Sequence, residues 1–255
     1  MSLLTIVHVI AAAGVATAAP EPTAWKSTVS VGLVYVDGNA FGLTGNAVAA
    51  VERRSSGWVF AARSQGSYGM ARGAGKAQRE VSAASAAVQL RADRRHVPAF
   101  SSYVLALAET DHVKSIEWRP GLEVGTEWVP IERAEADRMR SVRIDLGLRT
   151  AKEYRFQYYP ERRDVADAPT SVTPRVALLY REHLSNEVAF AQDAEVLTSV
   201  TESGRSFVNT LSSLTARIAG ELRAGVTLKV SFDSAPAPTK RQADSVLGLT
   251  FEYGL

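Results

Sequence analysis

Histidines beside carboxylates are the residues of this chain that could move protons in a reaction. Of the four histidines, His112 directly follows Asp111, and such a pair can act as general acid and base in a hydrolase. Adjacent strand residues point to opposite faces, however, and no second acidic pair is placed to join these two. His8 lies in an apolar leader, and His96 and His183 lie in other segments. We therefore predict no catalytic residue and no enzyme, and a hydrolase is the third functional hypothesis.

Metal and cofactor sites have no signature in this sequence. The chain contains no cysteine, which excludes disulfides and thiolate metal ligands. No glycine-rich phosphate loop and no His/Glu metal spacing is present. The formal net charge is +2, and the basic residues are interleaved with acidic ones instead of being clustered. We therefore expect no cofactor, no metal and no nucleic-acid partner.

Charged residues that alternate with apolar ones are more informative. Glu123 stands between Leu122 and Val124, and Asp145 stands between Ile144 and Leu146. In a strand this spacing places the charges on one face and the apolar side chains on the other. Buried charges need partners, and neighbouring strands of opposite charge supply them. The residues that we select from the charged face are Arg63, Glu117, Arg119, Glu123, Arg143, Asp145, Arg149, Arg175, Arg181, Glu187, Asp193 and Lys229.

The elements that must position these charges are β-strands. Period-two alternation recurs from residue 25 to the end of the chain, and turn signals such as Asp37-Gly38-Asn39 separate the segments. The pattern predicts twelve strands, each near the ~9–11 residues that cross a bilayer at a tilt. The weakest strand is 80–91, where the Ala-rich composition favours a helix over 78–91 as the competing prediction. The charged segment 130–138 favours a connection with one helical turn.

Twelve strands with one apolar and one charged face predict an all-β fold, a closed antiparallel transmembrane β-barrel. After residue 22 no window is long and apolar enough for a membrane helix, and only a closed barrel satisfies strand backbones in lipid. Connections after odd strands are the longer ones, with the longest over 151–171, as in barrels with long outer loops and short periplasmic turns. The alternative is a soluble sandwich or lipocalin-like barrel, but the mid-strand charges favour the membrane barrel.

Aromatic residues support the same orientation of the barrel, with the short turns on the periplasmic side. Trp25, Trp58, Trp128 and Tyr253 all fall near the predicted periplasmic rim, where an aromatic girdle would lie.

The first residues are expected to direct export. Residues 3–15 are apolar, and Ala16-Thr17-Ala18 supplies the small residues of a cleavage site, so 1–18 is predicted to be a signal peptide. The competing interpretation is a membrane anchor, for which the apolar run is shorter than the ~20 residues of a spanning helix. Residues 19–24 would then be a short linker and 25–255 a barrel in the outer membrane of a Gram-negative bacterium.

The last strand alternates without interruption. Leu247, Leu249, Phe251, Tyr253 and Leu255 share one face. A final strand of this kind resembles the closing strand of bacterial outer-membrane barrels, whose terminal alternation is read by the insertion machinery. The usual last residue in that resemblance is Phe, whereas this chain ends in Leu255. The expected partners are therefore the lipid bilayer, the barrel-insertion machinery and a small solute of unknown identity.

Three segments together resemble one family. They are the opening Trp25 with Val31-Gly-Leu-Val-Tyr-Val-Asp-Gly-Asn39, the Glu109-Thr-Asp111 segment ahead of Trp118-Arg-Pro-Gly-Leu122, and the ending over 232–253. In order and spacing they are similar to the salt-induced outer membrane protein family, whose function is unknown. The resemblance covers essentially the whole mature chain. It implies an outer-membrane barrel and supplies no catalytic residues.

The functional prediction is a narrow porin-like channel for small hydrophilic solutes, lined by the selected charged residues. An arginine-rich wall facing an acidic wall would produce a transverse field, as in a narrow porin. Side chains that interlock across the lumen would instead close it, and a twelve-stranded barrel is intermediate in size between filled and open barrels. The alternative is a closed structural barrel, or one that binds partners through the Tyr/Arg-rich loop 151–171. An outer-membrane hydrolase is third.

Overall fold

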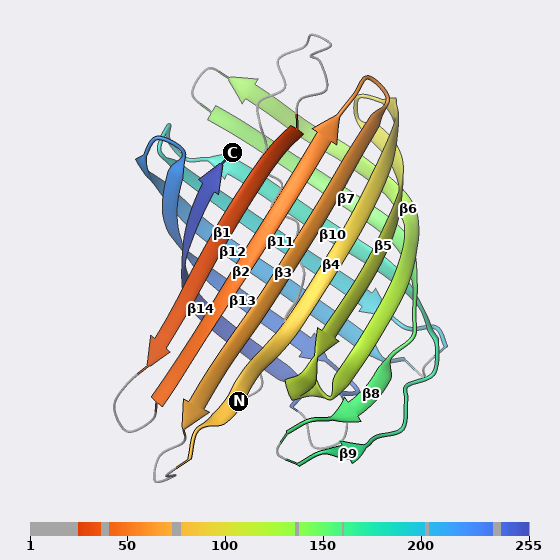
Figure 1. The fold of residues 1–255 in the computed structure, drawn as a ribbon. Helices are drawn as coiled ribbons and strands as arrows, with labels where there is room; N and C mark the ends of the chain where they lie inside the picture. Colours follow the sequence, from red (N-terminus) through yellow and green to blue (C-terminus); the bar gives the residue numbers. More distant parts are fainter. Residues whose placement is uncertain are drawn as a thin grey trace.

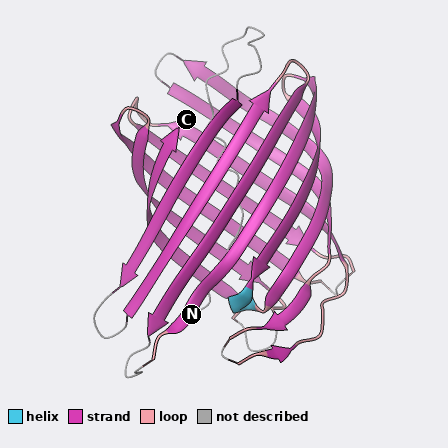
Figure 2. Ribbon diagram, viewed as in Figure 1, coloured by secondary structure: helices cyan, strands magenta, loops and turns pink. Residues whose placement is uncertain are grey.

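Twelve antiparallel strands form a closed barrel in the computed structural model, as the alternation predicted (Figures 1 and 2). The described residues are 25–36, 41–72, 78–135, 138–159, 161–201, 204–236 and 241–254. The barrel strands are β1 (Trp25–Val36), β2 (Phe41–Arg54), β3 (Trp58–Arg72), β4 (Glu80–Val97), β5 (Phe100–Asp111), β6 (Ile116–Glu135), β7 (Arg138–Ala151), β10 (Ser171–His183), β11 (Val188–Thr198), β12 (Ser206–Ala219), β13 (Leu222–Asp233) and β14 (Ala243–Gly254). The predicted signal peptide 1–18, the linker 19–24 and Leu255 lie outside the described residues.

Closure of the barrel follows from its first and last strands. Each barrel strand pairs with its neighbours in the sequence, with β7 pairing directly with β10, and β5 pairs with β6. β14 returns to β1, with Val31 opposite Phe251 and Leu33 opposite Leu249. Every described barrel strand therefore has a partner on both sides, which is the arrangement that satisfies the backbone of strands in lipid.

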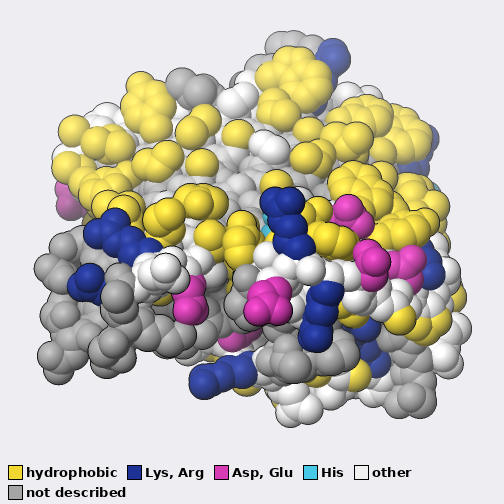
Figure 3. All heavy atoms as spheres, turned by 60° about the horizontal axis from the view of Figure 1, so that its bottom comes forward, with side chains coloured by type: hydrophobic (Ala, Val, Ile, Leu, Met, Phe, Trp, Pro, Cys, Tyr) yellow, Lys and Arg dark blue, Asp and Glu magenta, His cyan; other side chains and the backbone are white. Residues whose placement is uncertain are grey.

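The apolar face of each strand points outward. Along β14, Leu247, Leu249, Phe251 and Tyr253 are all exposed, with Leu247 at 67%. Figure 3 looks obliquely at one end of the barrel and shows hydrophobic side chains over the side wall in view, with charged side chains gathered toward that end. An apolar outer surface around a polar interior is the pattern of a barrel that sits in a bilayer.

The two ends of the barrel differ. At one end, the lower end in Figure 1, the connections carry the 3-10 helix η1 (His112–Lys114) and the short strands β8 (Tyr154–Gln157) and β9 (Arg163–Asp164). We call this the loop end. At the other, the turn end, the connections are short, such as 98–99 and 220–221.

The four aromatic residues that were predicted to form a girdle at one rim lie at the turn end. Trp25, Trp58, Trp128 and Tyr253 are there, and all four side chains are exposed, with Trp25 at 56%.

The strand predicted over 80–91 is confirmed, because 80–97 is the strand β4, paired along its length with β3 and β5. The competing helix over 78–91 is not formed. The helix preference of Ala is a few tenths of a kcal/mol per residue, on the order of 0.5, and two flanking strands override it. The helical turn predicted in 130–138 is not formed over its described part 130–135, since β6 continues to Glu135 after a register shift between Trp128 and Ile131. No helix among the described residues is long and apolar enough to cross a membrane.

Candidate functional site

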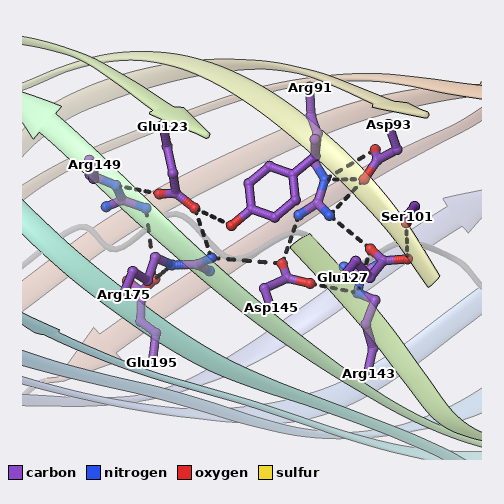
Figure 4. Close-up of polar contacts among 11 residues, drawn as sticks. Arg91, Asp93, Ser101, Glu123, Glu127, Arg143, Asp145, Arg149, Arg175 and Glu195 are labelled. Carbon is purple, nitrogen blue, oxygen red and sulfur yellow. Dashed lines mark hydrogen bonds and ion pairs between the residues drawn. The ribbon is translucent and has the colours of Figure 1, made fainter. Parts of the chain in front are cut away.

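A network of polar side chains follows the inner face of six neighbouring strands, from β4 to β11 (Figure 4). We call it the charged belt. Its members are Arg91, Asp93, Tyr103, Glu123, Glu127, Arg143, Asp145, Arg149, Arg175 and Glu195.

Glu123 is the most deeply buried carboxylate of the charged belt, at 0% exposure. It lies directly opposite Arg149 on the neighbouring strand, and Arg149 Nε donates to Glu123 Oε2 at 2.7 Å. The Tyr103 hydroxyl donates to Oε1 at 2.6 Å, and Arg175 Nη1, from the far side of β7, donates to Oε1 at 3.1 Å. The carboxylate is therefore held by three donors from three strands.

A glycine makes room for this arrangement. A Cβ on Gly147 would lie 2.6 Å from the Tyr103 hydroxyl and 2.8 Å from Glu123 Oε1. Contacts under 3.0 Å are not tolerated by real Cβ atoms. Any larger residue at 147 would therefore displace the two side chains that meet there.

Arg91 joins three carboxylates at the other end of the charged belt. Its guanidinium donates to Asp93 on its own strand at 2.7 Å, to Glu127 at 2.8 Å and to Asp145 at 2.7 Å. It also lies over the Tyr103 ring, 4.0 Å from the ring centroid. Because β5 and β6 separate β4 from β7, Arg91 reaches past two strands to bind Asp145.

The charges alternate along the wall. Arg175 Nε donates to Glu195 Oε2 at 2.6 Å, and Asn209 on β12 donates to Glu195 Oε1 at 2.8 Å. Arg143 lies 3.4 Å from Glu127 and 3.8 Å from Asp145. Among the described residues no arginine wall faces an acidic wall, because β7 itself alternates Arg143, Asp145 and Arg149 and each charge is paired with a neighbour.

A second network lies at the loop end around Glu153, in the loop after β7. Arg119 is ion-paired with Glu109 and donates to Glu153 Oε2 at 3.0 Å. Arg155 donates to Glu153 Oε1 at 2.5 Å, and Arg205 Nη2 lies 3.7 Å from Glu153 Oε2. Burial favours the neutral acid, but the three arginines outweigh it and hold the pKa of Glu153 below its usual value.

This network and a second ion pair cross the mouth of the barrel. Arg205 also donates to Asp233 at 2.7 Å, which extends the Glu153 network from β6 to β13. Lys114 Nζ lies 3.4 Å from Asp244 Oδ2 on β14, and we call this pair the latch. Burial lowers the pKa of Lys114, although Asp111 and Asp244 oppose the shift.

A cavity lies toward each end of the lumen. The loop-side cavity has about 140 Å³ of space for water, and Asp193 and Glu195 contribute to its lining. The turn-side cavity has about 270 Å³, and Arg181 and Ser213 contribute to its lining. Each is large enough for several waters, since one water needs roughly 10–15 Å³ of such space. Arg181 on β10 is ion-paired with Asp193 on the neighbouring strand β11, and we call this pair the partition. Asp193 lines the loop-side cavity and Arg181 lines the turn-side cavity, so the partition lies on the wall where the two cavities approach each other.

The selected residues divide into five groups. Glu123, Arg143, Asp145, Arg149 and Arg175 belong to the charged belt, Arg119 to the Glu153 network, and Arg181 and Asp193 form the partition. Arg63 and Lys229 lie on β3 and β13, apart from the charged belt. Glu117 and Glu187 lie elsewhere.

Glu117 and Glu187 are exposed. The carboxylate of Glu117 accepts a hydrogen bond of 3.4 Å from Tyr158 in the loop after β7. Glu187 lies in the turn 184–187 before β11, not within that strand. The bulge that shifts the pairing between Glu109 and Asp111 breaks the alternation near Glu117.

Sequence reasoning missed Arg91, Asp93 and Tyr103. The strand predicted over 80–91 ends at Arg91 and leaves out Asp93, whereas β4 runs on to Val97. The available signal was the alternation itself, since Arg91 and Asp93 are in phase with the buried Ala83 and Ala87.

The Asp-His pair has no shared contact. Asp111 Oδ1 accepts a hydrogen bond from the backbone N–H of Lys114 and caps η1, whereas the His112 ring stacks on Tyr158 at 4.0 Å between centroids. Among the described residues, no group of three His, Cys, Asp or Glu side chains could hold a metal ion.

Comparison with known proteins identifies a family and a fold. A sequence model of the family described as protein of unknown function, DUF481, matches residues 29–255. No curated protein matches the chain. The crystal structure of an outer membrane channel from Pseudomonas putida F1 is 10% identical, with 95% of this chain and 100% of that chain covered and a TM-score of 0.52. At this identity the likeness shows the fold alone, an outer-membrane barrel, which implies a lipid bilayer environment.

Two porin structures are also similar. The KdgM porin in complex with disordered oligogalacturonate is 11% identical, with 89% of this chain and 98% of that chain covered and a TM-score of 0.46. The NanC porin is 11% identical, with 89% and 97% covered and a TM-score of 0.44.

Proposed function

The chain belongs to the DUF481 family of proteins of unknown function, and from this premise we propose that it is a narrow channel for small hydrophilic solutes in the bacterial outer membrane. The observation that carries the proposal is that a cavity with room for several waters lies toward each end of the lumen, one lined by Asp193 and the other by its ion-pair partner Arg181. A barrel whose interior was filled to serve only as a scaffold would not need two such cavities. On this proposal the barrel is not an enzyme.

The lining of the cavities supports passage of polar solutes. The charged belt pairs its charges along the wall, so guanidinium and carboxylate groups line the loop-side cavity without having to reach across it. The turn-side cavity is lined by hydroxyl groups, among them those of Ser213 and Thr250, and by charged side chains such as Arg181 and Glu252. A hydrophilic solute can exchange hydrogen bonds with such walls, whereas a lipid cannot.

The route would have three steps. A solute enters at the mouth, beside the latch and the Glu153 network, and reaches the loop-side cavity along the charged belt. It then passes the partition of Arg181 and Asp193 and leaves through the turn-side cavity. The partition is the step at which size and charge are selected, because a solute must pass the two charged side chains of Arg181 and Asp193 there.

Several expectations belong to this proposal. The signal peptide 1–18 would direct export, and the insertion machinery would read the final strand, of which Leu247, Leu249, Phe251 and Tyr253 face outward. We also propose that the chain is a salt-induced outer membrane protein, on its resemblance to that family.

Liposome swelling tests the proposal. The mature chain is reconstituted into liposomes, and swelling is followed in isosmotic arabinose, glucose, sucrose and raffinose. A narrow channel predicts swelling that falls steeply from arabinose to raffinose. Swelling in arabinose no faster than in liposomes that hold heat-denatured protein would contradict it, provided that the folded barrel shows heat-modifiable mobility on a gel.

A second candidate is the closed structural or surface-binding barrel. Two ties across the mouth favour it, the latch and the Glu153 network. It predicts a folded barrel that excludes arabinose, and removal of the ties would not make it permeable.

A further inference from the structure

Three hydrogen-bond donors on one strand lack partners. Arg63 lies on the inner face of β3 and is 7% exposed. Its Nε and Nη1 atoms are buried and make no hydrogen bond, and neither does Nε2 of Gln65, two residues further along the same face. Unmade hydrogen bonds of buried donors are costly, at about 1–3 kcal/mol each and more for charged groups. The donors therefore indicate a place where an acceptor from outside the chain would be bound.

A second cation faces the same region. Lys229 lies on the inner-face register of β13, and it is within electrostatic range of Arg63. Among the described residues, neither Lys229 nor Arg63 takes part in an ion pair, although Asp111 and Glu109 are within electrostatic range of Lys229. The arginines of the charged belt differ, since Arg91, Arg149 and Arg175 each contact two or more carboxylates.

Acceptors without hydrogen bonds lie on another part of the wall. Oδ2 of Asp193 and Oδ1 of Asn209 are buried and accept no hydrogen bond, whereas Oδ1 of Asp193 is ion-paired with Arg181. Asp193 lies within electrostatic range of Arg63, yet the two form no ion pair. Five strands separate β3 from β11 in each direction around the barrel, so the unpartnered donors and acceptors lie on opposite walls.

We propose that Arg63, Gln65 and Lys229 form a binding station for a small hydroxylated carboxylate inside the lumen. The carboxylate would accept the hydrogen bonds of Arg63 and Gln65 and lie beside the ammonium of Lys229. The hydroxyl groups would donate to Asp193 and Asn209 on the opposite wall. A guanidinium binds a carboxylate through charge-assisted hydrogen bonds, which are about twice as strong as neutral ones. The proposal rests on the channel proposed above and names its substrate class.

Isothermal titration calorimetry provides the first test. Gluconate is titrated into the mature chain folded in detergent, with sorbitol as an uncharged compound of similar size and hydroxyl content. The wild type should bind gluconate and not sorbitol. Arg63→Gln and Lys229→Gln should each weaken gluconate binding about tenfold, because each removes a charged partner of the carboxylate.

The matched control is Arg133→Gln, since Arg133 is exposed on β6 and far along the strand from the charged belt. It should bind gluconate as the wild type does. Heat-modifiable mobility establishes that each variant is folded. If Arg63→Gln does not fold, Lys229→Gln and Gln65→Leu carry the test alone.

The result that would overturn the binding station is a wild type that binds no gluconate, or an Arg63→Gln variant that binds it equally well. The unpartnered donors would then be served by water.

Failure of the channel is a separate outcome. Gluconate binding by a barrel that excludes arabinose in the swelling assay would leave the station in place and refute transport. Arabinose permeation without gluconate binding would support transport and refute the binding station. Reversal potentials in potassium gluconate add a third readout, in which Lys229→Gln should shift selectivity toward potassium.

Discussion

Lys114 and Asp244 form an ion pair of 3.4 Å although five strands separate them one way around the barrel and six the other. η1 makes this contact possible. Asp111 caps η1, and Ser115 ends it in the left-handed region at φ 64°, so that the chain turns inward before β6. The side chain of Lys114 therefore crosses the mouth.

Lys114→Met should open the mouth. Asp244 would be left as a half-buried carboxylate without its ion-pair partner. Loss of one partner costs about 1.5–3 kcal/mol, which is a tenfold or larger shift from closed to open. Arabinose should therefore enter liposomes faster than through the wild type. Lys26→Met, at an exposed lysine on β1, is the control and should change nothing.

A double variant separates the latch from general damage. Lys114→Met combined with Asp244→Leu removes both charges, and an apolar pair of this kind is often as stable as the ion pair that it replaces. Swelling should return toward the wild-type rate. Swelling that stays at the rate of Lys114→Met would mean that the ion pair does not close the mouth.

Glu123→Gln should destabilise the barrel strongly. Arg149 and Arg175 would lose a fully buried carboxylate, and breaking a buried ion pair costs about 3–5 kcal/mol. Urea unfolding in lipid vesicles measures the loss. Glu117→Gln, at an exposed glutamate of the same strand, should stay within about 0.5 kcal/mol of the wild type. Equal effects of the two variants would show that the charged belt does not stabilise the fold.

The Glu153 network should depend on pH. The pKa of Glu153 in the folded barrel is held below its ordinary value of 4.5, so the folded state binds the proton less readily than the unfolded state does. The stabilisation is fully present above pH 4.5 and is lost as the pH falls through the lowered pKa. Proteolysis of the loop 152–170 should therefore be slow at pH 7 and 5 and faster below pH 4.

Glu153→Gln supplies the control for this titration. It lacks the charge at every pH, so its loop should be cleaved at the fast rate at pH 7. A wild-type loop that is cleaved equally fast at pH 7 and below pH 4 would contradict the assignment.

The strands could be predicted from the sequence, but the ion-pair partners of the charged side chains could not. Alternation depends on which side of the strand is wetted, so it predicted the twelve strands and the outward face of Leu247 to Tyr253. Which charged side chains pair when their strands are not neighbours depends on barrel curvature and on loops. No local pattern shows that Arg91 passes two strands to bind Asp145, or that Lys114 reaches Asp244.

Errors occurred where alternation is interrupted. Glu117 lies near a bulge and Glu187 lies in a turn, and both are exposed, whereas the period-two pattern had placed them inward. In 78–91, helix preference and strand pattern gave opposite predictions, and the pairing with both neighbours decided the outcome.

The outer face gives a test of the membrane environment. Leu249 is exposed in the middle of β14, and Leu249→Arg should cost about 2–4 kcal/mol in unfolding from lipid vesicles if this position lies near the bilayer midplane. Leu249→Ala keeps the face apolar and should cost much less. Equal stability of the two variants would place Leu249 outside the bilayer.

Single-channel conductance in a planar bilayer tests the central claim, that the lumen conducts, most directly. If the lumen conducts, we expect discrete current steps for the mature chain. We also expect that Arg181→Gln, which breaks the partition, alters their size and ion selectivity, whereas Arg217→Gln at an exposed site of β12 leaves both unchanged. A silent bilayer, obtained with protein that shows heat-modifiable mobility, would contradict the account and leave a closed barrel.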